Sequence, residues 1–205
     1  IMKLAKYIIS ASFLMVLPSF TLDSEKSFDM KRQSTLPFKV GEEVTYRIHY
    51  GLVNAGVATI LVKEKTELNG RNVFHMVGEG HTTGMTDWFF PTEDRYETFM
   101  DEETLLPRKF VRDVDEGGYI IKRNIVFDRE ANQAKDYELK KDTVFSMPEE
   151  VHDIFSAFFF ARSLDASHIQ PGDVIDVPVF LDHEMFPFKI KFVKRELINT
   201  KFGKI

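Results

Sequence analysis

The sequence contains no cysteine in its 205 residues, a single tryptophan, and no long block of basic residues. The absence of cysteine excludes disulfides, thiolate catalysis, cysteine-ligated zinc and the lipid-modified cysteine of a lipoprotein. The net charge of −5 and the lack of a basic cluster exclude a nucleic-acid-binding surface of the usual kind. No apolar run reaches the length of about 18 residues that a membrane helix needs, so no transmembrane span is predicted in the mature chain.

The motifs that accompany common chemistries are also missing. Gly78, Gly80 and Gly84 approach a dinucleotide fingerprint, but the third glycine falls one position late and no βαβ pattern surrounds it. There is no phosphate-binding loop and no G-x-S-x-G nucleophile elbow. None of the six histidines forms an H-E-x-x-H pair. The sequence therefore predicts no cofactor, no metal site and no catalytic residue, although a histidine pair assembled by the fold stays open.

The N-terminus has the order of a secretory signal peptide. Lys3 and Lys6 precede a short apolar run at 7–17, and Pro18 ends that run. An uncleaved anchor or a buried helix are the alternatives. We expect residues 1–22 to be a signal peptide, 23–37 a flexible lead-in and 38–205 a single β-rich domain, in an exported protein of the periplasm or cell envelope.

Most of the remaining chain alternates between apolar and polar residues with the period of two that is typical of half-buried strands. Turn residues separate the segments, among them Asn69-Gly70 and Gly117-Gly118. Pro178 and Pro187 interrupt the last two strands and indicate sheet edges or bulges. The predicted strands are 44–50, 57–62, 71–83, 95–100, 109–114, 119–127, 174–180 and 186–193.

One helix interrupts this pattern. Ser146-Met147-Pro148-Glu149 matches a capping box, and the apolar residues that follow it have helical spacing. We therefore expect a helix at about 149–164. The predicted fold is mainly β (α+β), a curved antiparallel sheet or half-open barrel wrapped around this one amphipathic helix.

Two segments contain candidate functional residues. The stretch 84–91 holds the only tryptophan beside Phe89 and Phe90, which suits either core packing or the mouth of an apolar ligand site. Glu93, Asp94 and Glu97 follow it. Two carboxylates beside aromatic rings can indicate a glycosidase, but the same residues are also typical of a solvated strand start.

Several short stretches together resemble the DUF3108 family of exported bacterial proteins, a domain of unknown function. The resemblance implies an envelope location in a Gram-negative bacterium and a half-open antiparallel barrel similar to periplasmic lipoprotein carriers. It implies no catalytic residues. It also implies that relatives continue beyond Ile205, so that the domain is expected to be incomplete at its C-terminus. The matching residues are Gly41-Glu42-Glu43, Tyr46-Arg47-Ile48-His49-Tyr50-Gly51, Asn54-Ala55-Gly56, Gly80, Thr82-Thr83-Gly84, Asp87-Trp88-Phe89-Phe90, Asp94-Arg95-Tyr96-Glu97, 101–107, Arg112 and Glu116-Gly117-Gly118-Tyr119.

Three functions follow from these observations. The first is a binding protein that cradles a lipid, a glycolipid or another amphipathic ligand on the sheet. The second is a scaffold that docks on another envelope protein through an edge strand. The third is a glycan-acting enzyme, with Glu93, Asp94, Glu97 and His81 as acid–base candidates. The predicted wall residues of the ligand site are Trp88, Phe89, Phe90, Phe155, Phe158 and Phe159.

Overall fold

The computed structural model describes residues 32–51, 53–200 and 203–204. The predicted signal peptide and most of the predicted lead-in lie outside this range. At its start, the backbone N–H of Gln33 donates to the carbonyl of Ser163 at 2.8 Å and the Arg32 guanidinium donates to the carbonyl of Glu103. Contacts with the domain therefore extend back to residue 32. Within the described ranges no helix combines the length and apolar character that crossing a membrane requires.

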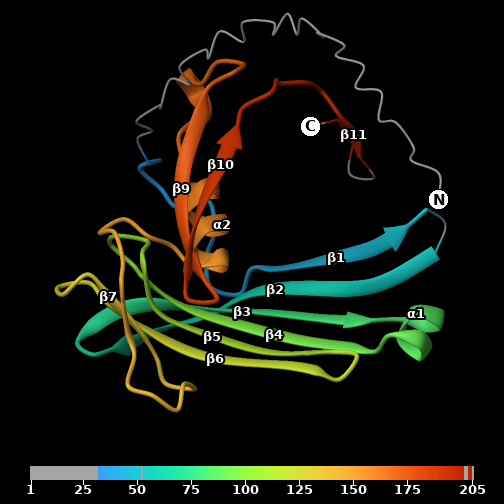
Figure 1. The fold of residues 1–205 in the computed structure, drawn as a ribbon. Helices are drawn as coiled ribbons and strands as arrows, with labels where there is room; N and C mark the ends of the chain where they lie inside the picture. Colours follow the sequence, from blue (N-terminus) through green and yellow to red (C-terminus); the bar gives the residue numbers. More distant parts are fainter. Residues whose placement is uncertain (1–31, 52, 201–202, 205) are drawn as a thin grey trace, which may run out of the picture.

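One large antiparallel sheet dominates the molecule, as the sequence predicts (Figure 1). Its eight strands lie side by side in chain order, and β1 and β8 form its two free edges, so the sheet is not closed. Each strand pairs antiparallel with the next, which makes the sheet a meander. The strands are β1 (Glu43–Tyr50), β2 (Val53–Leu68), β3 (Arg71–Thr82), β4 (Thr92–Asp101), β5 (Pro107–Glu116), β6 (Tyr119–Asp128), β7 (Gln133–Asp136) and β8 (Val144–Ser146).

Two tight turns fix the register of this meander. Asn69 and Gly70 connect β2 to β3 with φ values of 51° and 78°, and Gly117 and Gly118 connect β5 to β6 with φ values of 62° and 90°. Two successive residues with positive φ match the right-handed twist of paired strands, and asparagine and glycine tolerate that conformation best. Both predicted turns are confirmed.

The predicted helix start is wrong. Helix α2 covers Ile154–Ser163, and its N-cap is Asp153 rather than Ser146. The Asp153 carboxylate accepts hydrogen bonds from the backbone N–H groups of Phe155 and Ser156, and the Ser156 hydroxyl accepts one from the Asp153 N–H. This is a genuine capping box, located seven residues after the predicted one, while Ser146 ends β8 and pairs with Gln133.

The remaining elements follow the sheet in the chain. A short helix, α1 (Gly84–Phe89), connects β3 to β4, and a turn of 3₁₀ helix covers Ala166–His168. Strands β9 (Val174–Leu181) and β10 (Glu184–Lys191) form a separate hairpin, in which Pro178 and Pro187 stand opposite each other. Both strands of a two-stranded ribbon are edges, which agrees with the prediction from these prolines. Strands β11 (Asn199–Thr200) and β12 (Gly203–Lys204) make a second, very short pair.

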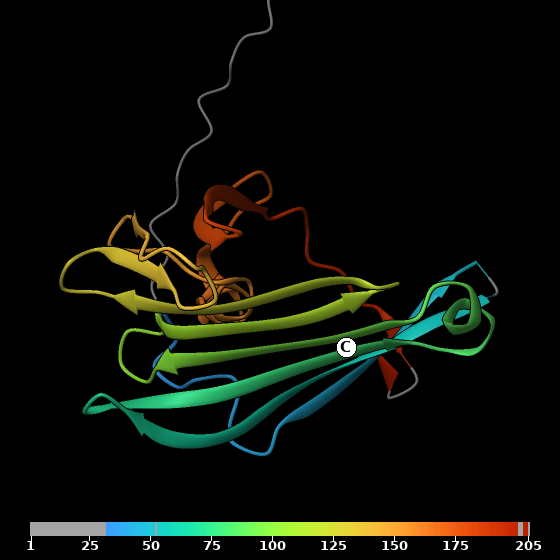
Figure 2. The same ribbon diagram turned by 60° about the horizontal axis from the view of Figure 1, so that its bottom comes forward.

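The core lies between one face of the sheet, helix α2 and the β9–β10 hairpin (Figure 2). Phe159 of α2 is fully buried there, with its ring 5.0 Å from that of Phe38. A second cluster joins Phe110 and Ile125 of the sheet to Phe180 of β9. Figure 1 shows that α2 and the hairpin stand over one part of the sheet only, and that the part nearer α1 extends beyond them.

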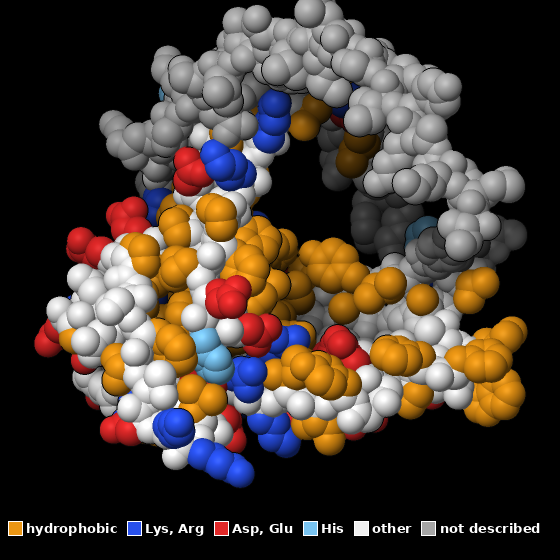
Figure 3. Space-filling view, in the orientation of Figure 1, with side chains coloured by type: hydrophobic (Ala, Val, Ile, Leu, Met, Phe, Trp, Pro, Cys, Tyr) orange, Lys and Arg blue, Asp and Glu red, His pale blue; other side chains and the backbone are white. Residues whose placement is uncertain are grey.

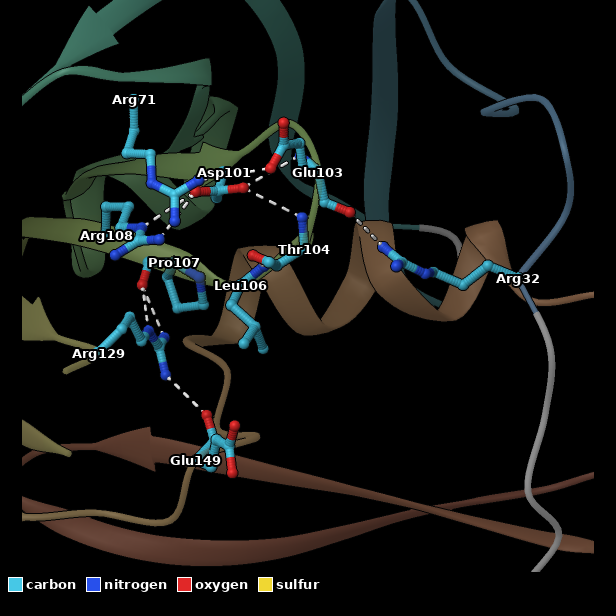
Figure 4. A network of polar contacts seen from close by, with 10 residues as sticks. All are labelled: Arg32, Arg71, Asp101, Glu103, Thr104, Leu106, Pro107, Arg108, Arg129 and Glu149. Carbon is cyan, nitrogen blue, oxygen red and sulfur yellow. Dashed lines mark hydrogen bonds and ion pairs between the residues drawn. The ribbon is translucent and has the colours of Figure 1, made fainter.

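A polar network holds the β4–β5 turn and joins it to the segment before α2 (Figure 4). The buried Asp101 carboxylate accepts hydrogen bonds from the N–H groups of Glu103 and Thr104, and from the Arg108 guanidinium at 3.0 Å. Arg129 donates to the carbonyls of Pro107 and Val151. Burial lowers the pKa of Arg129 to about 10, so this side chain stays charged at neutral pH.

Candidate ligand-binding site

The register of the sheet places residues of six strands in three parallel rows on the face that carries α2. Directly paired residues of antiparallel strands point to the same face, so each row can be followed from strand to strand. The first row is Val44, Ile60, Gly78, Tyr96, Arg112 and Arg123. The second is Tyr46, Ala58, Gly80, Asp94, Val114 and Ile121. The third, nearest to α1, contains Ile48, Gly56, Thr82, Thr92, Glu116 and Tyr119.

Helix α2 covers the first row. The Phe155 ring occupies the space above Gly78 so completely that a Cβ atom there would overlap it. The same ring stacks on Tyr96 with a centroid distance of 5.6 Å. Phe155 therefore marks the end of the helix-covered part of this face.

The rows beyond Phe155 expose apolar side chains. Tyr46 is 44% exposed, Ile48 51% and Tyr119 66%. In the space-filling view, hydrophobic side chains line the sheet to the right of the hairpin and gather at its right-hand end (Figure 3). Exposed apolar side chains that adjoin one another on a folded domain indicate a surface with a partner.

Small residues make a trough in this exposed surface. Ala58 and Gly80 are paired neighbours in the second row, between Tyr46 on one side and Asp94 on the other. A Cβ atom at Gly80 would meet only ordinary contacts, with Asp94 and the carbonyl of Val57 at 3.9 Å, so a side chain could be added there without overlap. We use the term trough for the surface formed by Tyr46, Ile48, Ala58, Gly80 and Asp94, which Phe155 closes at one end.

A polar group borders the trough. Burial raises the pKa of the Asp94 carboxyl above its ordinary value, Glu116 adds to the rise and Arg112 opposes it. Arg112 itself is held by Asp182, which accepts two hydrogen bonds from its Nη1 at 3.0 and 2.9 Å. The arrangement gives the trough one partly buried carboxyl with a raised pKa and one guanidinium next to it.

Strand β10 presents a row of exposed apolar side chains. Phe186, Phe188 and Ile190 pair with Val179, Val177 and Ile175, so they lie on the same face of the hairpin as these buried residues. Ile175 and Val177 belong to a core cluster against which Ala157 and Phe160 of α2 pack, which orients this face toward α2. The three β10 side chains continue that face and are themselves exposed.

The structure divides the predicted wall residues into two groups. Trp88, Phe89 and Phe90 lie on and just after α1, at one end of the sheet. Phe155, Phe158 and Phe159 lie on α2. Of these three, Phe155 bounds the trough and Phe158 is 38% exposed, whereas Phe159 is 0% exposed and part of the core.

The acid–base candidates are also divided. Residues Glu93 and Glu97 alternate with Asp94 along β4 and therefore point to the opposite face, as does His81, which pairs with Glu93. Glu97 accepts hydrogen bonds from His75 at 2.5 Å and from Arg95 at 2.8 Å. Burial alone would raise the pKa of Glu97, but these bonds lower it below its ordinary value. That shift is the reverse of what a catalytic acid needs.

Side chains of that opposite face line a shallow depression of about 420 Å³ together with Gly80 and Asp94. They are Glu79, His81, Glu93, Arg95, Asp113 and Asp115. No group of three or more histidine, aspartate or glutamate side chains among the described residues is arranged to hold a metal ion. Charged residues in the depression neutralise one another in part, since Arg95 pairs with Glu79 and with Glu97.

The family model described as protein of unknown function (DUF3108) matches residues 45–205, most of the chain. The chain belongs to the DUF3108 family. No curated protein and no solved structure matches it.

Sequence reasoning missed most of the trough of this DUF3108 domain. Tyr46 and Ile48 carried the family resemblance, as did Gly80 and Asp94, but nothing in the sequence joined them into one surface. They come from β1, β3 and β4, and only the pairing register brings them together. The sequence did contain one signal of this surface, the small residues in the strands on either side of the Asn69-Gly70 turn. Small residues inside strands often mark a place where a ligand or another chain segment comes close to the backbone.

Proposed function

We propose that this protein binds an amphipathic lipid on the helix-bearing face of its sheet. The apolar chain of the lipid lies in the trough over Ala58 and Gly80, and its polar group lies beside Asp94 and Arg112. The observation that carries the proposal is the pair of small residues, Ala58 and Gly80, beside the exposed apolar side chains of Tyr46 and Ile48. A flexible acyl chain fits such a shallow channel, because it needs apolar contact and no particular shape.

The polar residues support a ligand group that donates hydrogen bonds, such as a hydroxyl or an amine. Asp94 and Glu116 both present carboxyl oxygens on this face, and the raised pKa of Asp94 reflects their mutual repulsion as well as burial. A donor from the ligand would relieve that repulsion. Glycolipids and aminated lipids carry such groups.

The proposal includes an envelope location, in which lipids of this kind are present. It is supported by the order of positive, apolar and polar residues in 1–22 of the sequence.

The first test is native mass spectrometry of protein purified from an envelope fraction, with solvent extraction of whatever remains bound. We expect a reproducible adduct that extraction identifies as a lipid. An apo mass under conditions that preserve known lipid carriers would reject the proposal.

A variant that fills the trough sharpens this test. Gly80→Leu adds a bulky side chain to the trough at a position where a Cβ atom meets only ordinary contacts, so we expect at least a tenfold loss of retained lipid. Thr45→Leu adds a similar side chain to the opposite face of β1 and serves as the matched control. Thermal unfolding of both variants establishes that they are folded. Equal lipid retention in Gly80→Leu and the wild type would place the ligand elsewhere.

A second candidate function is a scaffold that pairs with another protein through β1. This strand is a sheet edge over all eight residues of Glu43–Tyr50. Free edges pair readily with extended segments of other chains. Cross-linking in cells from a cysteine introduced at Arg47 would identify such a partner. If the purified protein carries no lipid and forms one reproducible cross-link, the scaffold function is favoured over lipid binding.

A further inference from the structure

One end of the sheet carries an unusual concentration of exposed apolar side chains. They lie at three neighbouring connections, between β1 and β2, between β3 and β4, and between β5 and β6. Trp88 is 78% exposed and Phe89 70%, the highest values among the aromatic residues of this group. We call this group the aromatic tip; it consists of Val53, Met85, Trp88, Phe89, Phe90, Tyr119 and Ile120.

The three connections are tied to one another, so the tip is one surface. The backbone N–H of Thr83 donates to the carbonyl of Ala55 at 3.0 Å, and that of Gly117 donates to Pro91 at 2.8 Å. The Phe90 ring lies against Gly117 so closely that a Cβ atom there would come within 2.7 Å of it. In Figures 1 and 2, α1 lies at the same end of the sheet as these strand ends.

Helix α1 contributes nothing to the core, since none of its residues is buried. Its position is fixed by polar contacts instead. The Thr82 hydroxyl donates to Asp87 and accepts from the N–H of Thr92, both within 3.0 Å. The apolar side chains of α1 are therefore held at the surface by a hydrogen-bonded frame.

The chemistry of the tip is that of a membrane interface. Tryptophan, tyrosine and phenylalanine are the side chains that favour the boundary between lipid headgroups and acyl chains. The three connections at 51–54, 83–91 and 116–120 contain two acidic residues, Asp87 and Glu116, and no lysine or arginine. The tip therefore has no positive charge that anionic headgroups could attract, and its binding to a bilayer has to come from apolar contact.

The shape of the tip also favours a bilayer over a protein partner. Trp88 and Phe89 project from a six-residue helix. A fluid bilayer accommodates a projection of any shape, whereas a protein partner would have to supply a complementary pocket for each anchor residue. Tyr119 belongs to both the tip and the third row of the sheet, the row that also contains Ile48 of the trough.

We propose that the aromatic tip inserts into the interface of a neutral lipid bilayer and docks the protein on the membrane by apolar contact. This inference does not depend on the trough, because docking requires only the tip.

Trp88 is the only tryptophan of the protein, so its fluorescence reports on the tip alone. The full chain is titrated with phosphatidylcholine vesicles, with and without bromine atoms on the acyl chains as quenchers. We expect a blue shift of the emission, quenching by the brominated lipid, and no loss of either effect at high salt. Sedimentation with vesicles is not used alone, because the apolar segment at 7–17 can bind lipid itself.

The variant Met85→Ser/Phe89→Ser keeps Trp88 as the reporter and removes two exposed side chains of the tip. We expect at least a tenfold weaker partition of Trp88 into vesicles. Tyr137→Ser removes an exposed aromatic ring beyond β7, away from the tip, and should bind vesicles like the wild type.

Three results would overturn the inference. The first is an unchanged Trp88 emission in the presence of vesicles. The second is a blue shift that occurs without vesicles and grows with protein concentration, which would show that a second copy or another protein surface covers the tip. The third is binding that requires anionic lipid and disappears at high salt. The Gly80→Leu variant keeps the two proposals distinguishable. If it loses retained lipid while Trp88 still inserts into vesicles, the trough and the tip act independently, and one proposal can fail without the other.

Discussion

The hydroxyl of Thr98 donates a hydrogen bond to the carboxylate of Asp153 at 2.5 Å, and both side chains are fully buried. This bond joins the middle of β4 to the N-terminus of α2. The other Asp153 oxygen accepts from the N–H groups of Phe155 and Ser156 at 2.8 Å. One carboxylate therefore caps the helix and fixes it to the sheet, and it sets the position from which Phe155 closes the trough.

Replacement of Thr98 by valine tests this link. Valine keeps the shape of the side chain and removes the donor, which leaves one oxygen of a buried carboxylate without its partner. We expect the free energy of unfolding to fall by about 1–3 kcal/mol, measured by urea denaturation. Thr66→Val, at an exposed position of β2, is the control and should change stability by less than about 0.5 kcal/mol. Equal effects of the two substitutions would show that the bond adds nothing.

The same carboxylate gives stability a characteristic pH dependence. Burial raises the pKa of Asp153 to about 6, from an ordinary value of 3.8, even though the hydrogen bonds from Thr98, Ser156 and Phe155 oppose the rise. Between these two values the unfolded chain has lost this proton while the folded chain keeps it. Protonation then favours the folded state, so the contribution of Asp153 to stability decreases as the pH rises from about 4 to about 6.

Asp153→Asn isolates this contribution, because asparagine also caps helices and does not titrate. We expect the stability of the wild type relative to Asp153→Asn to fall by up to about 3 kcal/mol in all as the pH rises from about 4, and to stay constant above about pH 7. Urea denaturation of both proteins at four pH values measures it. A difference that increases over this range would mean that the hydrogen bonds outweigh burial and that the pKa is lowered.

The sequence predicted the sheet well and the helix boundary poorly, for physical reasons. In β5, for example, Phe110 and Val114 are fully buried on one face while Asp113 is exposed on the other, so apolar and polar residues alternate. Strands β7 and β8 have four and three residues, which is too short for a recognisable alternation, and they were missed. Ser146 has the right neighbours for a cap, but its pairing with Gln133 in β8 prevails.

The candidate site shows the same limit. The sequence singled out Trp88 and Phe89 as unusual, and both are exposed, but strand register decides which residues share a surface with them. The carboxylates are the clearest case. We predicted that β4 starts at Arg95, whereas it starts at Thr92, and this extension turns Glu93 and Asp94 to opposite faces of the sheet.

The space above Gly78 gives a prediction about packing. A Cβ atom at this position would overlap the Phe155 ring, so Gly78→Ala forces the ring or α2 to move. We expect a loss of about 1–3 kcal/mol, typical of an overpacked core. Gly80→Ala, two residues along the same strand, meets only ordinary contacts at 3.9 Å and should be neutral within about 0.5 kcal/mol.

A double substitution identifies Phe155 as the cause. Leucine at position 155 frees space above β3, so Gly78→Ala/Phe155→Leu should be less destabilised than the sum of the two single changes, by at least about 0.5 kcal/mol. Thermal or urea unfolding of the four proteins completes the cycle. Additive effects would mean that the clash is relieved elsewhere.

The turn of the β9–β10 hairpin is held to the sheet by charge. Asp182 accepts two hydrogen bonds from Arg112, and the neighbouring His183 is 2.8 Å from the buried carboxylate of Asp136. Asp182 has a φ of 48°, a conformation that asparagine tolerates as well as aspartate does. Asp182→Asn therefore removes the charge of the carboxylate without straining the turn.

We expect Asp182→Asn to release this end of the hairpin more than it lowers global stability. Arg112 is mostly buried, so its pair with Asp182 should contribute about 1 kcal/mol, more than an exposed pair. Hydrogen exchange of the β9–β10 amides should become several-fold faster. Asp113→Asn breaks a pair with Lys122 of the same 2.9 Å length, but both partners are more than half exposed, so exchange should not change. Equal exchange rates in the two variants would show that packing on α2, and not the Arg112–Asp182 pair, holds the β9–β10 hairpin in place.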